Sequence, residues 1–203
     1  MTVTLDTPVL ALDAAGQDLL FREARTANTF SDEPVTEEQV RAIYELVKWG
    51  PTALNAQPLR VLIVRSAQAR ERLVPLMGGS NQAKTAAAPL VAVLGYDVDF
   101  HDHLPTVFPH FPGARDLFAE ESARHATGRD NALLQAGYFL LGVRAAGLAA
   151  GPMAGFDAAG VDAEFFPDGR TRTLVVVNIG RPSPDAWFGR SPRLDYNQVV
   201  TTL

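Results

Sequence analysis

The stretch TEEQVRAIYELVKWGPTALNAQPLRVLIVR, residues 36–65, begins with an amphipathic pattern. Its apolar residues recur at every third or fourth position, which is the spacing of one helix face. Thr36 and Gln39 stand in the Thr-x-x-Gln arrangement of a capping box, in which two side chains satisfy free N–H groups of the first turn. The pattern therefore predicts a helix over residues 36–49.

A loop and a strand follow within the same stretch. Gly50 and Pro51 end the helix, and prolines at both ends of segment 51–58 disfavour regular helix there, so we expect an ordered loop. Residues 60–65 then carry the run Val-Leu-Ile-Val, whose β-branched side chains favour a strand.

The rest of the chain continues to mix helices with strands. Helices are expected at 66–77, near Ser80 before Pro89, and at 130–146, where Asp130 begins the helix and Gly147 ends it; strands are expected at 90–94 and 173–180, with a Gly-Pro-Met-Ala-Gly turn at 151–155. Segment 90–94 is apolar throughout and resembles a strand buried on both faces. Helices mixed with about four strands predict an α+β sandwich.

Residues 97–128 differ from the scaffold around them. They contain all four histidines of the chain and little periodicity, so we expect an excursion or lid over a substrate pocket. The tail after Arg181 is rich in proline and is expected to be extended. No repeat or linker divides the sequence, which favours one domain over residues 1–203.

Composition narrows the class of protein. The 203 residues carry a formal charge of −5, which argues against nucleic acid or anionic lipid as a partner. Cysteine is absent, and the N-terminus lacks a basic flank before a long apolar run, so we expect a cytoplasmic protein. The longest apolar stretch, at 132–150, is interrupted by Gln135 and Arg144 and predicts a buried helix instead of a membrane span.

Several common catalytic motifs are missing. The sequence contains no G-x-G-x-x-G after a strand, no phosphate-binding G-x-x-x-x-G-K-[ST] and no G-x-S-x-G elbow. His101, Asp102, His103 and His110 allow a metal hypothesis, but four histidines in a polar and aromatic segment are more often surface or pocket residues. We therefore expect no metal.

A basic and polar cluster near the N-terminus offers a different kind of site. Arg22 and Arg25 are followed by Thr26 and Asn28, which together provide charged and neutral hydrogen bonds for a phosphate and hydroxyl groups. Solvated arginines beside a local turn are the alternative interpretation of the same residues.

Five motifs in order make the chain similar to the nitroreductase flavoprotein family. They are ARTANTF at 24–30, WGPTALNAQP at 49–58, NQAK at 81–84, GPMAGF at 151–156 and RSPRL at 190–194. Together with VFPH at 107–110, this wording most resembles the malonic semialdehyde reductase branch. The resemblance implies an α+β fold with a mostly antiparallel sheet flanked by helices, and a homodimer with two FMN sites at its interface and domain-swapped C-terminal tails.

The resemblance also assigns cofactor-binding residues. One subunit would contribute Arg25, Thr26, Asn28, Asn81, Lys84, Pro152, Met153, Ala154, Gly155, Arg190 and Arg193, and the opposing subunit Pro51, Thr52, Ala53 and Asn55. Relatives usually carry further basic residues where this chain has Ala24 and Asn28, so contacts to the phosphate would be redistributed, with Arg190 and Arg193 as the replacements. Many relatives also have Glu at the position of Ala154, but a contact through the backbone survives that change.

Two side chains would take part in the chemistry of this implied site. Lys84 lies three residues after Asn81, so both would address the N1 and O2 edge of the isoalloxazine, where a cation stabilises the reduced anion. His110 is a candidate proton donor to the substrate.

The implied activity is ping-pong hydride transfer from NADPH or NADH through FMN to a small electrophile, with reduction of malonic semialdehyde to 3-hydroxypropanoate as the first expectation. A broad nitro- or quinone-reductase would use the same flavin site with another pocket shape. A flavin-binding protein without turnover, and a metal-dependent enzyme built on the histidine segment, are the remaining alternatives.

Overall fold

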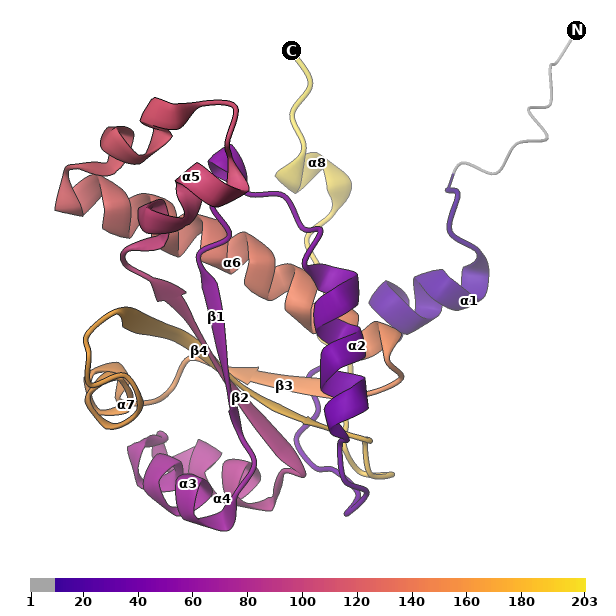
Figure 1. Cartoon of the computed structure of the whole chain (residues 1–203). Helices are drawn as coiled ribbons and strands as arrows, with labels where there is room; N and C mark the ends of the chain where they lie inside the picture. Colours follow the sequence, from indigo (N-terminus) through magenta and orange to yellow (C-terminus); the bar gives the residue numbers. More distant parts are fainter. Residues whose placement is uncertain (1–9) are drawn as a thin grey trace, which may run out of the picture.

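A four-stranded antiparallel sheet forms the centre of the molecule (Figure 1). The computed structural model describes residues 10–203. The strands are β1 (Leu59–Val64), β2 (Leu90–Asp97), β3 (Ala149–Met153) and β4 (Thr171–Gly180), in the spatial order β1-β2-β4-β3. The helices are α1 (Ala14–Gln17), α2 (Glu37–Val47), α3 (Ala67–Leu73), α4 (Gly79–Ala87), α5 (Leu104–Val107), α6 (Glu121–Ala145), α7 (Ala158–Phe165) and α8 (Tyr196–Val199).

Helices cover both faces of the sheet, and β2 serves both layers. Leu90, Ala92 and Leu94 pack into a core with α2 and α6, whereas Val91 and Val93 pack into a second core with α3 and α7. Successive side chains of a strand point to opposite faces, so a strand covered on both sides is apolar throughout. The α+β class, the antiparallel sheet and the fully buried central strand are confirmed.

The helix signals at residues 36–49 and 66–77 are also confirmed in their essentials. Thr36 and Gln39 form both hydrogen bonds of the capping box of α2. The Ser66 side chain accepts the N–H of Ala69 at the start of α3. The predicted stretch after Ser66 ends in a 3-10 turn, Val74–Leu76.

The start of the long helix is a correction to the sequence prediction. α6 begins at Glu121, whereas we expected it to begin at Asp130. Residues 121–130 are polar and mostly exposed, so they carry no apolar periodicity to reveal a helix. The far end agrees with expectation, because Gly147 has a φ of +72° directly after the helix.

The second correction concerns the predicted turn at 151–155, whose first three residues belong to β3. Glycine and proline in succession are typical of turns, which is why the strand was missed. Pro152 is tolerated because β3 is at the edge of the sheet, where one row of N–H groups needs no partner strand.

The excursion after β2 consists of short helical pieces around a small core of its own. The 3-10 turns Phe100–His103 and Pro112–Phe118 flank α5, and the last part of the predicted excursion is the beginning of α6. Phe100, Leu104 and Phe118 are buried together. Figure 1 shows this cap at one end of the sheet, in crimson.

An ion-pair network fixes the base of the excursion to the sheet. The Asp97 carboxylate is 3% exposed and accepts Arg60 Nη2 at 2.6 Å and Arg170 Nε at 3.1 Å, with His103 Nε2 at 3.5 Å. Arg170 and Arg115 also contact Asp102. A buried carboxylate needs such partners, and here they come from β1, from the residue before β4 and from the excursion itself.

The tail after β4 has no regular structure until α8, as its prolines predicted. Within residues 10–203, no helix combines the length and apolar character required to cross a lipid bilayer.

Candidate functional site

The polar segment 24–28 is held between the edge strand and the tail. Ala27 N–H donates to the Ala150 carbonyl of β3 at 3.1 Å, and Asn28 N–H donates to the Ala186 carbonyl of the tail at 3.0 Å. Main-chain bonds on both sides fix the direction of Arg25, Thr26 and Asn28. Residues far apart in sequence thus meet along one side of the sheet.

Helix α4 adds the predicted amide and ammonium to the same place. Lys84 Nζ donates to Asn28 Oδ1 at 2.7 Å, and Asn81 Nδ2 donates to the Gly155 carbonyl at 3.0 Å. Both side chains lie on one face of α4, as their spacing predicted. Together with Thr26, Pro152, Met153 and Asn178 they line a hollow of about 230 Å³.

The turn after β3 follows directly on Pro152 and Met153, which line this hollow, whereas Ala154 and Gly155 are not among its lining residues. The Gly155 carbonyl also accepts the N–H of Gly78 at 2.8 Å, and a methyl group on Gly78 would be only 2.8 Å from that carbonyl oxygen. The approach therefore requires glycine at 78. Among residues 10–203, no acceptor is found for the N–H groups of Ala154 and Gly155, which remain available to a ligand.

A second hollow of about 250 Å³ adjoins the first and is lined by arginines. The two hollows share Thr26 and Asn28, and the second adds Arg25, Arg190 and Arg193. Arg190 donates to the Arg22 and Ala24 carbonyls, so the tail arginine bridges to the N-terminal segment. Both candidate tail arginines thus reach the site, and the geometry does not separate them.

The loop predicted to come from an opposing subunit lies apart from these hollows. Ala53 N–H donates to Asn131 Oδ1 at 2.7 Å, and Asn55 Nδ2 donates to the Val107 carbonyl at 2.8 Å. Pro51, Thr52, Ala53 and Asn55 line neither hollow. This loop therefore belongs with the excursion cap within its own chain.

The loop also holds an unusual backbone. Leu54, Asn55 and Gln57 have φ values of 52°, 51° and 46°, in a region that non-glycine residues rarely adopt. Each such residue costs of the order of 1 kcal/mol, and strain of this kind clusters at functional sites. Packing of Leu54 and Ala56 into the excursion core holds the conformation in place.

The histidines are dispersed over the excursion and the start of α6. His110 is exposed, with its ring centroid 3.9 Å from that of Phe108, and it lines neither polar hollow of its own chain. His103 faces Asp97, and His125 accepts or donates to the Tyr96 hydroxyl at 2.8 Å. Within residues 10–203, no three histidine or carboxylate side chains are grouped as metal ligands would be.

Three residues at the site were not among the sequence-predicted ones. Asn178 of β4 lines the first hollow, and its Oδ1 is buried without a hydrogen-bond partner in the described chain. Arg144 of α6 and Trp187 of the tail both contact Arg25. One feature of the sequence could have pointed to Arg144, because it is the lone charged residue in the apolar stretch 132–150.

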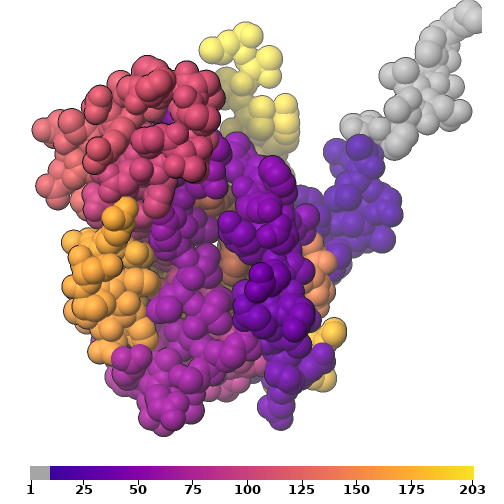
Figure 2. Space-filling view, in the orientation of Figure 1, coloured from indigo at the N-terminus to yellow at the C-terminus, as the bar shows by residue number. Residues whose placement is uncertain are grey.

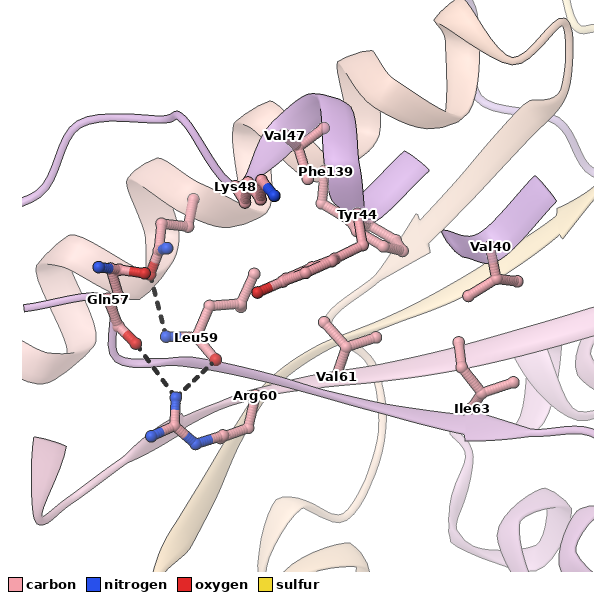
Figure 3. A pocket seen from close by; sticks show the side chains of 11 residues that line it. Val40, Tyr44, Val47, Lys48, Gln57, Leu59, Arg60, Val61, Ile63 and Phe139 are labelled. Carbon is pink, nitrogen blue, oxygen red and sulfur yellow. Dashed lines mark hydrogen bonds between the residues drawn. The ribbon is translucent and has the colours of Figure 1, made fainter. Parts of the chain in front are cut away.

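A separate and mostly apolar groove of about 430 Å³ lies between α2 and β1 (Figure 3). Val40, Tyr44 and Val47 of α2 form one side, and Val61 and Ile63 on the outer edge of β1 form the other. Figure 3 shows their side chains facing one another across it. The groove contains neither the arginine cluster nor Lys84, so we do not assign the chemistry to it.

Comparisons with known proteins identify the family of the chain. The protein-family sequence model described as "Nitroreductase family" matches residues 21–181 of this chain. A Streptomyces coelicolor protein named as an NADH dehydrogenase/NAD(P)H nitroreductase is 65% identical over 195 residues, which cover 96% of this chain and 99% of the relative.

Solved structures share the fold at much lower identity. A nitroreductase from Exiguobacterium sibiricum in complex with FMN has a TM-score of 0.82 at 20% identity and covers 97% of this chain and 100% of its own. An NAD(P)H:FMN oxidoreductase from Staphylococcus epidermidis has a TM-score of 0.80 at 17% identity and covers 96% and 98%. With the matched sequence model and the relative that is 65% identical, these findings establish that the chain belongs to the nitroreductase family.

Proposed function

We propose that this chain is an FMN-dependent NAD(P)H oxidoreductase. The observation that carries the proposal is the joining of two hollows of different character at Thr26 and Asn28. One is bordered by an ammonium and amide side chains, is followed by a turn with free main-chain N–H groups, and suits a polar planar ring. The other is bordered by three arginines, and suits a phosphate.

The polar atoms at the site support a bound FMN. Arg25 Nε and Asn178 Oδ1 are buried and find no hydrogen-bond partner among the described residues. Buried polar groups are rarely left unsatisfied, so each points to a ligand group in the space beside it. Arg25 would hold the phosphate, and Thr26 and Asn28 the ribityl hydroxyls and the pyrimidine edge.

When bound, FMN would supply hydride chemistry that no side chain in this protein can supply. Lys84 would face the pyrimidine edge of the ring, where negative charge develops on reduction, and would stabilise that charge. Its ammonium is held by Asn28 Oδ1 at 2.7 Å, so its position is set before any ligand arrives. Ala154 and Gly155 would contribute main-chain N–H donors on the opposite edge.

We propose that a homodimer completes each site. Thr52, Ala53 and Asn55 would border the ring of a second copy, since they lie away from the hollows of their own chain. The hydrogen bond from Asn55 to the Val107 carbonyl ties this loop to the excursion. A second copy would therefore bring its His110 along with the loop, and His110 is the candidate proton donor.

The C-terminal tail is the second support for a dimer. Leu194, Tyr196 and Val199 are 67–69% exposed, and the tail projects from the body of the molecule (Figures 1 and 2). Such apolar side chains favour burial on another surface. The apolar groove beside β1 offers that surface to the tail of a second copy.

For the substrate, we propose malonic semialdehyde, reduced to 3-hydroxypropanoate in a ping-pong cycle. NADPH or NADH and the aldehyde would occupy the same exposed space in turn. The sequences at 107–110 and 151–156 support this choice. The second candidate is a broad nitro- or quinone-reductase, which is favoured by the relative's name.

Flavin binding is tested with two variants and one control. Arg25→Ala is expected to weaken FMN retention, and Lys84→Ala to lower the potential of the bound flavin. Arg72→Ala, on α3 and paired with Glu164, is the control, because Arg72 is an exposed cation that lines neither hollow. Wild-type FMN affinity and wild-type flavin potential in both site variants would contradict the assignment of Arg25 and Lys84 to the FMN site.

Turnover and substrate are tested with the purified holoenzyme. Anaerobic addition of NADPH or NADH should bleach the yellow colour, and a persistent colour would leave only a flavin-binding protein. The value of kcat/KM is then compared for malonic semialdehyde, a nitroarene and a quinone. Preference for the aldehyde is expected, and equal or better use of the other two would support the second candidate.

A further inference from the structure

Two arginine side chains, those of Arg25 and Arg144, lie close to the ring of Trp187 beside the proposed phosphate site. The guanidinium carbons of Arg25 and Arg144 are 5.9 Å and 5.7 Å from the Trp187 ring centroid. Both distances are within the range of cation–π attraction. Arg144 Nη2 also donates to the main-chain carbonyl of Arg25, so it contacts the same residue through the backbone.

The charges around this group are not balanced. Arg25, Arg144, Arg190 and Arg193 border two hollows that share Ala24, Arg25, Thr26 and Arg193. Among residues 10–203, only the Glu23 carboxylate, 3.4 Å from Arg25, is within ion-pair distance of any of the four. Burial lowers the pKa of Arg144, as expected for a cation with little water around it. An anion would offset this excess of positive charge.

We propose that Arg144 and Trp187 are positioning residues that hold Arg25 for a phosphomonoester and thereby set the preference for FMN over riboflavin. The inference rests on the proposed function. Trp187 restricts the rotamers of Arg25, so less side-chain entropy is lost when the phosphate binds. Arg144 fixes the main chain at Arg25 through its hydrogen bond to the Arg25 carbonyl and adds positive charge nearby.

The test compares two ligands that differ only in the phosphate. Apoprotein of full length is titrated with FMN and with riboflavin by flavin fluorescence. Trp187→Leu is expected to weaken FMN binding about tenfold and riboflavin binding less than about twofold, from the size of a partly desolvated cation–π pair. Arg144→Gln should act in the same direction, and Trp187→Phe should restore part of the loss.

The control is a similar pair far from the site. Arg72 lies 5.2 Å from the Phe165 ring centroid, and Phe165→Leu should leave the ratio of the two affinities unchanged. An unchanged ratio in Trp187→Leu, or equal losses for both ligands, would overturn the inference. If Trp187→Leu does not fold, the ratio of FMN affinity to riboflavin affinity is measured in Trp187→Phe and Arg144→Lys instead, and an unchanged ratio in both would overturn the inference. Wild-type protein that binds neither flavin would instead overturn the proposed function.

Discussion

Replacement of Gly151 by alanine tests how closely segment 24–28 must approach the sheet. A methyl group at this position of β3 would be 2.6 Å from the carbonyl oxygen of Ala27, whereas real Cβ contacts are essentially never shorter than 3.0 Å. The obstructing atom belongs to the main chain, so no side-chain rotation relieves the contact. The segment itself would have to move by at least about 0.4 Å.

That movement has two expected costs. Over-packing with a backbone shift destabilises proteins by about 1–3 kcal/mol, which gives the expected fall in the free energy of unfolding. Thr26 and Asn28 flank the displaced carbonyl, and their hydrogen bonds to FMN would lengthen. Partial loss of one hydrogen bond to a charged or strongly polar group corresponds to about a tenfold increase in the Kd for FMN.

Urea unfolding of the apoprotein and fluorescence titration with FMN measure the two effects separately. Gly79→Ala is the matched control, because Gly79 begins α4 at the same site and an added methyl group there would meet nothing within 4 Å. Wild-type stability in Gly151→Ala would refute the packing argument. Lower stability with unchanged FMN affinity would refute the link between this contact and the site.

Two further predictions concern packing and pH. Gly142→Ala should lower the free energy of unfolding by about 1–2 kcal/mol in chemical denaturation, because the new methyl group would be 2.3 Å from a valine of α2. The higher helix propensity of alanine offsets only part of this cost. Gly137→Ala, on the open side of α6, should raise the free energy of unfolding by about 0.5–1 kcal/mol. Hydrogen bonds from Ser183 and Thr29 lower the pKa of Asp185, so its stabilising contribution is complete above its ordinary pKa of about 3.9 and is lost as the pH falls through the lowered value. Asp185→Asn should therefore flatten the acid side of the stability profile, and a wild-type slope would contradict this.

Local signals in the sequence predicted those elements whose structure depends on neighbours in the chain. The capping box of α2, the Ser66 cap of α3 and the apolar run of β2 depend on residues within a few positions of one another. β3 was missed because its position at the sheet edge, which makes Pro152 acceptable, is a property of the tertiary structure. The first turns of α6 were missed because a polar, exposed helix has no apolar period.

The residues of the site likewise fall into two groups, those that short motifs predicted and those that they did not. Arg25, Thr26, Asn28, Asn81 and Lys84 belong to short motifs that resemble the family, and the structure brings them together. Arg144 and Trp187 form no motif, since they are 43 positions apart in the sequence, and they contact each other and Arg25 only in the folded chain. Their relation depends on how α6 and the tail pack, which a single sequence does not reveal.

The way the site is built links cofactor binding to the docking of the tail. The arginine-lined hollow joins segment 24–28 to the tail. The tail is fixed there by the hydrogen bond from Asn28 N–H to the Ala186 carbonyl and by contacts of the Thr29 hydroxyl with the Ser183 hydroxyl and the Asp185 carboxylate. A phosphate between Arg25 and Arg190 would attach both segments to one anion. A ligand that binds only the assembled state stabilises it by a free energy that grows with the logarithm of the ligand concentration relative to Kd, so FMN would favour the docked tail and the docked tail would favour FMN.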